Sequence, residues 1–365
     1  MLTMSSNMSH EEVSPSRRIA ILGLGQMGMV CAGMLSAKDK PGGVRGGETS
    51  IVMWGHSAEE ADALAQTRAS KRLAGFELPA SVRVTTKAAD ALKGADLIVS
   101  AIPVQHIREV WTSLGKFVEP HAGIVSVAKG IENSTLLRPT QITTGVLREL
   151  KVDDPDKKPR RVGVLSGPTI ATELARCLPA AMIAASDDAA FAVHIQRTFA
   201  TSWLRVYTNP DVAGVELAGA VKNVIAIAAG VVDGLQAGNN AKSAMLARGL
   251  AEITRLGVAL GANAETFFGV AGVGDLATSC FSPEGRNRSC GEALGRGRKL
   301  NEYLAESPYV VEGVATCKSV VELAAKYRVD MPIAHAVHSI LFDDVDPIEA
   351  IGMLMSREQK AEHVG

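Results

Sequence analysis

Short apolar runs recur along the first 208 residues, and stretches with apolar residues at helical spacing separate most of them. The first run, residues 18–22, stops at Gly23, as a buried strand does before a tight turn. The runs that we predict to be strands are residues 18–22, 50–54, 82–85, 97–102, 123–127, 162–165 and 181–184. Because strands alternate with helices, we predict an α/β fold with a Rossmann-like, doubly wound and mostly parallel sheet.

The pattern changes after Asn209, where only helical spacing of apolar residues follows. In residues 241–260, for example, Arg248, Glu252 and Arg255 lie three or four positions apart, which predicts a charged, exposed helix face. The sequence therefore predicts an all-α second domain. We expect the chain to divide into a loose N-terminal tail (residues 1–16), a Rossmann-like domain (17–208) and a helical domain (209–365).

Composition excludes several classes of protein. Of 365 residues, 47% are apolar and 21% are charged, and the formal net charge is −1. Such proportions are ordinary for a globular protein, and without a basic excess we expect no nucleic-acid partner. The most apolar stretch, residues 212–232, contains Glu216, Lys222 and Asn223, so we expect no stable membrane insertion. The five cysteines lack metal-site or disulfide spacing, which predicts no metal and a cytoplasmic protein.

A G-x-G-x-x-G motif, with Gly23, Gly25 and Gly28, lies between the first predicted strand and a predicted helix. In this context the first glycine allows the tight turn, the second lets the backbone approach a pyrophosphate, and the third allows close packing of helix and sheet. The N-terminus of the helix then offers free N–H groups and the positive end of its dipole. We therefore predict that the first domain binds a dinucleotide. A purely structural turn, or a site for another nucleotide-like ligand, stays open.

The end of the second predicted strand normally decides between NAD and NADP, because an acidic side chain there binds the ribose 2′-hydroxyl of NAD. Here residues 54–57 include no acid, and the first carboxylate is Glu59. Nothing at this position would repel a 2′-phosphate, so the predicted cofactor is NADP or NAD. His56 is a candidate contact to the cofactor, and an ordinary exposed loop residue is the alternative.

Two lysines occupy positions that suggest chemistry. Lys129 follows the strand of residues 123–127 at its carboxyl end, where ligands bind in open α/β sheets, although a solvated lysine would occupy the same place. Lys222 lies in a helix that is apolar almost all round, and such a helix is buried. Because a buried ammonium costs several kcal/mol unless it is paired, we predict a functional role for Lys222. An ion pair with Glu216 is the structural alternative.

A third candidate group lies in residues 272–288. Asp275 comes after glycines, and Arg286, Asn287 and Arg288 follow it. Taken alone, Asp275 could be a helix N-cap, and the other three could form a solvated surface turn. Together with the two lysines they supply what a phosphorylated ketone requires, namely cations for the phosphate, a proton donor and a carboxylate to orient that donor.

With these motifs in this order, the chain resembles the NAD(P)-dependent glycerol-3-phosphate dehydrogenases, particularly the bacterial biosynthetic type. The resemblance extends from about residue 18 to residue 354. The segments that carry it are residues 23–28, 101–103, 129–132, 166–169, 221–224, 274–276, 285–287 and 310–314. It implies the reversible reduction of dihydroxyacetone phosphate to sn-glycerol 3-phosphate by NAD(P)H, which supplies glycerophospholipid synthesis.

The resemblance also implies roles for individual residues. The implied catalytic residues are Lys222 (the general acid and base), Lys129 and Asp275. The glycine-rich motif, the end of the second predicted strand and the resemblance together give the expected cofactor contacts, which are Gly23, Gly25, Gln26, Met27, Gly28, His56, Lys129, Ala171, Arg286, Val310 and Glu312. The implied contacts to the phosphorylated triose are Lys129, Gly167, Thr169, Lys222, Asp275, Gly285, Arg286 and Asn287.

Some residues depart from the pattern of this family. Gln26 and Met27 replace a small and then an aromatic residue, which alters packing against the cofactor. Ser279 stands where relatives often carry Thr, and Gly285 where many bacterial members carry Ser, and both changes leave the charged residues intact. The loop of residues 38–49 is longer than usual, and we assign it no purpose.

Two other functions are compatible with these motifs. A β-hydroxyacid dehydrogenase shares the two domains and a lysine near an asparagine on a helix, but it takes a carboxylate substrate. A non-catalytic NAD(P) sensor would bind the cofactor to change its partners, and the pair of lysines with Asp275 disfavours it. The sequence leaves the oligomeric state open, a homodimer included.

Overall fold

The computed structural model describes residues 18–37, 49–153, 159–307, 309–359 and 361. In these residues the first domain contains one eight-stranded sheet with the order β3-β2-β1-β4-β5-β6-β7-β8. The strands are β1 (Arg18–Leu22), β2 (Ser50–Trp54), β3 (Val82–Thr85), β4 (Leu97–Ser100), β5 (Gly123–Ser126), β6 (Val162–Ser166), β7 (Ala180–Ala185) and β8 (Leu204–Asn209). The predicted tail and residues 38–48 of the predicted loop lie outside the described residues.

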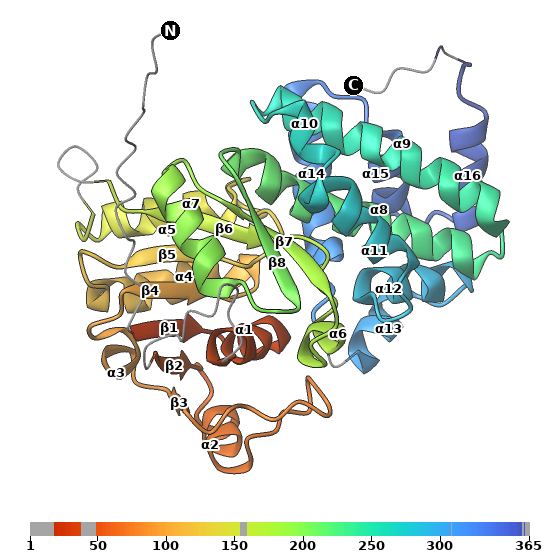
Figure 1. Ribbon diagram of the computed structural model, residues 1–365. Coiled ribbons are helices and arrows are strands. Elements are labelled where there is room, and N and C mark those ends of the chain that lie inside the picture. Colours follow the sequence, from red (N-terminus) through yellow and green to blue (C-terminus); the bar gives the residue numbers. More distant parts are fainter. Residues whose placement is uncertain (1–17, 38–48, 154–158, 308, 360, 362–365) are drawn as a thin grey trace, which may run out of the picture.

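Neighbouring strands of the sheet run parallel, except that β6 and β7 are antiparallel. β1 lies between β2 and β4, where Ile21 pairs with Met53 and Val99. These central strands are buried on both faces, which is why they are continuous apolar runs in the sequence. The predicted Rossmann-like, mostly parallel sheet is confirmed (Figure 1).

Sequence analysis predicts no strand over β8, and this is wrong. β8 is an edge strand with Leu204 and Val206 buried and Arg205 and Tyr207 exposed. Such alternation is typical of a half-buried strand, and it gives no continuous apolar run in the sequence. The strand predicted over residues 97–102 is also shorter, because β4 ends at Ser100.

Helices cover both faces of the sheet (Figure 1). They are α1 (Gln26–Ser36), α2 (Ala58–Thr67), α3 (Ala88–Leu92), α4 (Val104–Leu114), the 3₁₀ helix η2 (Gly115–Phe117), α5 (Pro139–Glu149), α6 (Ala171–Ala175) and α7 (Ala189–Phe199). Met29 of α1 and Phe191 of α7 lie in the core on one face. Trp111 of α4 and Val146 of α5 lie in the core on the other.

The second domain is helical and lies beside the sheet (Figure 1). Its helices are α8 (Val212–Gly234), α9 (Gly238–Ala259), α10 (Ala264–Phe267), the π-helix η3 (Val270–Gly274), α11 (Asp275–Phe281), α12 (Arg286–Gly295), α13 (Leu300–Glu306), α14 (Glu312–Tyr327), α15 (Pro332–Phe342) and α16 (Pro347–Met355). α8 runs through the centre and packs against α9, α11, α12 and α14. Gly291 allows close contact between α8 and α12, because a Cβ at this position would lie only 2.0 Å from the carbonyl oxygen of Ile227.

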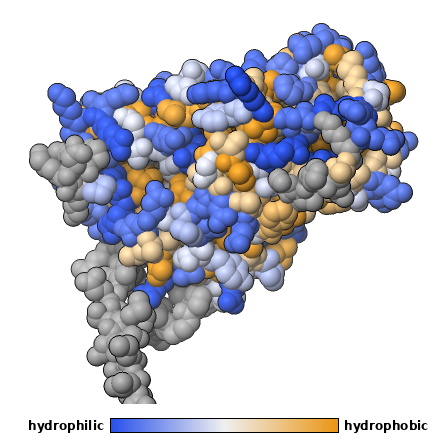
Figure 2. All heavy atoms as spheres, turned by 90° about the horizontal axis from the view of Figure 1, so that it is seen from above, coloured by the Kyte–Doolittle hydropathy of each residue, from blue (hydrophilic) through white to orange (hydrophobic). Residues whose placement is uncertain are grey.

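Among the described helices, α8 is long and apolar enough to cross a membrane, but 94% of its most apolar 18-residue stretch is buried inside the protein. In the face that Figure 2 shows, hydrophilic residues extend over both ends of the molecule, and apolar residues lie in smaller groups among them. Because its most apolar part is buried, α8 serves as the core helix of the second domain.

The charged face predicted on α9 is only partly correct. Arg248 is exposed, but the side chain of Glu252 is buried. The Glu252 carboxylate accepts hydrogen bonds from the backbone N–H groups of Ile333 (2.7 Å) and Ala334 (3.2 Å) in the first turn of α15. Glu252 thus caps a neighbouring helix, which spacing along its own helix does not reveal.

Candidate active site

A cavity of about 510 Å³ lies between the carboxyl ends of the sheet strands and the helical domain. The loops after β1, β4, β5 and β6 line one side of it, and residues of α8, α11, α12 and α14 line the other. The predicted site residues that line it are Gly25, Gln26, Met27, Lys129, Thr169, Ala171, Lys222, Asp275, Gly285, Arg286, Asn287, Val310 and Glu312. Residues of both predicted domains therefore meet in one place.

The other predicted site residues, Gly23, Gly28, Gly167 and His56, do not line this cavity. Gly23 has a φ of +117°, and a Cβ on Gly28 would lie 2.2 Å from the Gly23 carbonyl oxygen, so these two glycines shape the turn. Gly167 contributes its carbonyl oxygen to Lys129. His56 is exposed beyond the end of β2, and its contact with the cofactor stays a prediction.

The glycine-rich end of the cavity fits the phosphates of a dinucleotide. α1 begins at Gln26 with Gly25, which has no side chain to cap the free N–H groups, as its N-cap, and its first turn contains no acid. A Cβ placed on Gly25 would meet nothing within 4 Å, so the backbone faces open space. An uncapped helix N-terminus beside open space favours an anion. The backbone of residues 25–27 is therefore the part that would hold a pyrophosphate.

The Lys129 ammonium is fixed by three hydrogen bonds. It donates to the Gly167 carbonyl oxygen (2.9 Å), Thr169 Oγ1 (3.1 Å) and Asp275 Oδ2 (2.6 Å). An ammonium has three N–H donors, so these contacts use all of them. The side chain is 14% exposed, and the alternative of a solvated lysine at a strand end is wrong.

Asp275 also binds the second lysine. Its Oδ1 lies 2.9 Å from Lys222 Nζ, and Lys222 donates a further hydrogen bond to Ser279 Oγ. All three side chains are buried, so one carboxylate bridges two ammonium groups in the interior of the cavity. The alternative pairing of Lys222 with Glu216 is wrong, because Glu216 accepts hydrogen bonds from Arg138 and Thr140 instead.

Burial and the neighbouring charges shift the pKa values of Lys129 and Asp275. Burial lowers the pKa of Lys129 to about 8, and the nearby Lys222 ammonium acts in the same direction against the pull of Asp275. Burial alone would raise the pKa of Asp275, but the two ammonium groups more than offset it, and this pKa lies below its usual value. Asp275 therefore stays ionised at neutral pH, and the proton of Lys129 is labile near neutrality.

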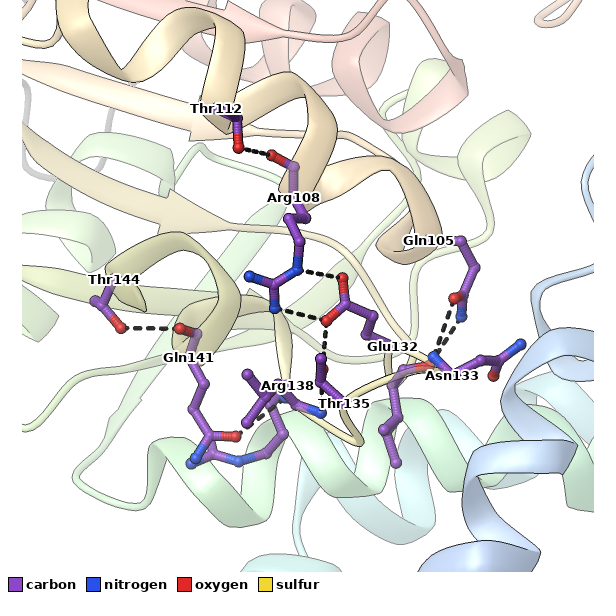
Figure 3. Close-up of polar contacts among 11 residues, drawn as sticks. Gln105, Arg108, Thr112, Glu132, Asn133, Thr135, Arg138, Gln141 and Thr144 are labelled. Atoms are coloured by element: carbon purple, nitrogen blue, oxygen red, sulfur yellow. Dashed lines mark hydrogen bonds and ion pairs between the residues drawn. The ribbon is translucent and has the colours of Figure 1, made fainter. Parts of the chain in front are cut away.

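The loop after Lys129 is anchored to both domains. The Arg108 guanidinium on α4 donates to both carboxylate oxygens of Glu132, at 3.0 and 2.8 Å, and Figure 3 shows this two-pronged pair beside Thr135. Ser319 on α14 donates to the Ile131 carbonyl oxygen at 3.2 Å. Because these contacts hold the residues that directly follow Lys129, the position of its ammonium depends on the two domains together.

Arg286 and Glu312 line the more exposed part of the cavity. Arg286 begins α12 and donates to the Val310 carbonyl oxygen at 3.1 Å, and its side chain reaches solvent. Glu312 begins α14, and burial raises the pKa of its carboxyl group against the opposing effects of Arg286 and the two lysines. Arg288 does not line the cavity, because its guanidinium pairs with Asp233 at 2.6 Å. Of the two arginines of this turn, Arg286 is therefore the one that lines the cavity.

Sequence analysis missed Asn223, which lines the cavity next to Lys222. Its Oδ1 accepts from Asn287 Nδ2 (2.9 Å), and Asn287 Oδ1 accepts from the Gly313 N–H (2.9 Å). These bonds orient the amide, and in the described residues its buried Nδ2 has no hydrogen-bond partner. Asn223 could have been found by the argument used for Lys222, since it too is polar in an apolar helix.

A Rossmann-like sheet with an open phosphate site, facing a lysine–carboxylate cluster on a helical domain, defines a dinucleotide-dependent oxidoreductase. Comparison with known families agrees with this class. The family model for the N-terminus of NAD-dependent glycerol-3-phosphate dehydrogenase matches residues 18–192, and the model for its C-terminus matches residues 211–352. The chain belongs to the NAD-dependent glycerol-3-phosphate dehydrogenase family and is an NAD(P)-dependent oxidoreductase.

Individual relatives agree with the family assignment. The chain is 43% identical to glycerol-3-phosphate dehydrogenase [NAD(P)+] 1 of Salinibacter ruber, over 86% of this chain and 90% of that protein. It is 40% identical to glycerol-3-phosphate dehydrogenase [NAD(P)+] of Geobacter sulfurreducens, over 95% of this chain and 99% of that protein. The crystal structure of glycerol-3-phosphate dehydrogenase from Coxiella burnetii superimposes with a TM-score of 0.85 at 32% identity, covering 93% of this chain and 99% of that one.

Proposed function

We propose that this chain interconverts dihydroxyacetone phosphate and sn-glycerol 3-phosphate with NADPH or NADH. The observation that carries the proposal is the Asp275 carboxylate, which bridges Lys129 and Lys222 in a cavity that also contains Arg286. This arrangement places a proton donor, a second ammonium held by three hydrogen bonds and a solvent-exposed guanidinium around one cavity. A phosphorylated ketone requires these three groups when it is reduced to an alcohol.

Lys222 is the proposed proton donor. In the described residues its ammonium has two partners, Asp275 and Ser279, which leaves one of its three N–H bonds for the substrate. Bound NAD(P)H supplies the hydride for the C2 carbon of the substrate. Lys222 donates the proton of its remaining N–H bond to the C2 oxygen as negative charge develops there. In the reverse reaction, the oxidation of the alcohol, Lys222 takes this proton back.

Lys129 and Asp275 hold this geometry. Lys129 has no N–H left to give, so its part is the positive charge that it places beside the developing oxyanion. Asp275 fixes the distance between the two ammonium groups and compensates part of their repulsion. Because the cluster is buried, these charges act more strongly than they would in water.

Amide and guanidinium groups bind the rest of the substrate in this proposal. Arg286 binds the phosphate, since a guanidinium matches a phosphate group in charge and shape. The unpaired Nδ2 of Asn223 donates to a substrate oxygen, and Asn287 orients Asn223. In this proposal the product supplies glycerophospholipid synthesis in the cytoplasm, as the resemblance to the bacterial biosynthetic type implies.

A spectrophotometric assay tests the proposal. The purified protein is mixed with dihydroxyacetone phosphate and NADPH or NADH, and oxidation of the cofactor is followed. We expect turnover with the triose phosphate and none with dihydroxyacetone or with 3-hydroxy acids and NADP⁺. Turnover of a hydroxy acid without turnover of the triose phosphate would instead assign a β-hydroxyacid dehydrogenase, and binding without any turnover would assign a sensor.

A further inference from the structure

Arg72 lies at the glycine-rich end of the cavity, and the site described above does not use it. It belongs to the segment between α2 and β3, and it lines the cavity together with Gly25, Gln26 and Met27. Gln26 Nε2 donates to the Arg72 carbonyl oxygen at 2.6 Å, which ties this segment to the glycine-rich loop. The position of Arg72 is therefore fixed relative to the start of α1.

The segment is also held from its other side. Arg68, the residue that follows α2, has a left-handed backbone conformation with a φ of +58°. Its guanidinium donates to the carbonyl oxygens of Leu78 (3.2 Å) and Val82 (2.8 Å), which close the segment back onto the start of β3. Arg72 thus lies on a segment that hydrogen bonds hold on two sides.

The guanidinium of Arg72 forms an ion pair with Glu60. Glu60 lies in the first turn of α2, where its N–H donates to Ser57 Oγ at 3.3 Å. α2 begins directly after the end of β2, and the ribose 2′ position of a bound dinucleotide lies beside this strand end in Rossmann folds. Arg72 therefore reaches from the cavity to the place where NAD and NADP differ.

The ion pair is weak enough to be exchanged. The side chains of Arg72 and Glu60 are 47% and 41% exposed, and ion pairs between solvent-exposed side chains contribute little to stability. A phosphate monoester carries more negative charge than a carboxylate and binds a guanidinium through two parallel hydrogen bonds. A 2′-phosphate should therefore replace Glu60 as the partner of Arg72.

We propose that Arg72 binds the adenosine 2′-phosphate of NADP, that Glu60 is the carboxylate it leaves, and that this chain consequently prefers NADP(H) to NAD(H). The inference rests on the proposed function only for the placement of the dinucleotide, and it does not depend on the triose phosphate. It assigns cofactor choice to the segment before β3 and not to the end of β2, where residues 54–57 contain no acid.

Calorimetric titration with two adenosine nucleotides tests this directly. Adenosine 2′,5′-bisphosphate and adenosine 5′-monophosphate differ only in the 2′-phosphate. The wild-type protein should bind the bisphosphate at least about tenfold more tightly, as expected for one added charged hydrogen-bonded pair. Arg72→Gln should abolish this difference and change binding of the monophosphate less than about threefold. Glu60→Gln should tighten binding of the bisphosphate, because it removes the competing carboxylate.

Arg83→Gln is the matched control. Arg83 is an exposed arginine on the neighbouring β3, its guanidinium donates to the Asp90 carbonyl oxygen, and it does not line the cavity. This variant should bind both nucleotides as the wild type does. Equal binding of the two nucleotides by the wild type would overturn the proposal. Equal weakening of both by Arg72→Gln would also overturn it, since Arg72 would then contact the adenine or the 5′-phosphate.

The same proteins separate this proposal from the proposed function. If neither cofactor supports turnover of dihydroxyacetone phosphate but the bisphosphate still binds more tightly through Arg72, the proposed function fails and the assignment of Arg72 stands. If turnover occurs and kcat/KM for NADPH and NADH is equal in both the wild type and Arg72→Gln, the assignment of Arg72 fails and the proposed function stands.

Discussion

Asp275 holds two ammonium groups that would otherwise repel each other in a buried space. The two lysines differ in what remains of their hydrogen-bonding capacity, because Lys129 has three protein partners and Lys222 has two in the described residues. On this difference we base the proposal that Lys129 supplies positive charge and Lys222 transfers the proton. The number of hydrogen bonds to the protein thus distinguishes two side chains of the same type.

The pH dependence of reduction should report the ionisation of Lys129. Its pKa of about 8 means that the ammonium is lost as the pH rises through 8, so kcat/KM for dihydroxyacetone phosphate should fall above that pH. In Lys129→Arg the guanidinium stays protonated, and the fall should move up by more than one pH unit. Steady-state rates from pH 6 to 10 measure this. An unchanged profile in the variant would show that another group sets the alkaline limb.

Arg286 should govern the affinity for the phosphate group. Because a charged hydrogen bond contributes about 1.5–3 kcal/mol, Arg286→Ala should raise KM for dihydroxyacetone phosphate about 10- to 150-fold. Arg296→Ala is the matched control, since Arg296 lies at the other end of α12, pairs with Glu292 and does not line the cavity. Steady-state kinetics compares the two variants. An unchanged KM in Arg286→Ala would remove the phosphate from this residue.

At the scale of elements, the strands and helices that the sequence predicts best are those that are buried on all sides, because their apolar residues then form one continuous run. The buried parallel strands and the apolar α8 are continuous in the sequence and were predicted. The edge strand β8 was missed because it is half-exposed and forms no continuous apolar run. The antiparallel β7 and the helix cap made by Glu252 depend on neighbours far along the chain, which local spacing does not encode.

Glu252 gives a test at this scale. Glu252→Ala leaves two backbone N–H groups at the start of α15 without their acceptor, so the free energy of unfolding should fall by about 1–3 kcal/mol. Kinetic constants of the folded enzyme should stay the same, because Glu252 does not line the cavity. Urea unfolding measures the first effect. Glu322→Ala on the exposed side of α14 should cost less than about 0.5 kcal/mol, and an equal loss in both variants would refute the capping role.

At the scale of the whole molecule, the site exists only when the two domains are packed together. Lys129 and Asp275 are 146 positions apart in the chain and 2.6 Å apart in space. Sequence motifs identified these residues as candidates, but they did not reveal that one carboxylate bridges both lysines. Nor did they reveal Asn223 or Arg72, whose significance comes from the cavity that they line. Residue type alone leaves Arg288 as a second candidate cation beside Arg286, and its pairing with Asp233 keeps it out of the cavity lining.

The bridged pair of lysines is tested most directly by Lys222→Met, which keeps the length of the side chain and removes the proton donor. We predict that kcat for reduction of dihydroxyacetone phosphate by NADPH falls about 10²- to 10⁴-fold, as for loss of a general acid. The dissociation constant for NADPH, measured by fluorescence titration of the same sample, should stay within about threefold of wild type. Retention of more than about a tenth of the wild-type kcat, roughly 1.4 kcal/mol in the barrier, would contradict the assignment of Lys222 as the proton donor.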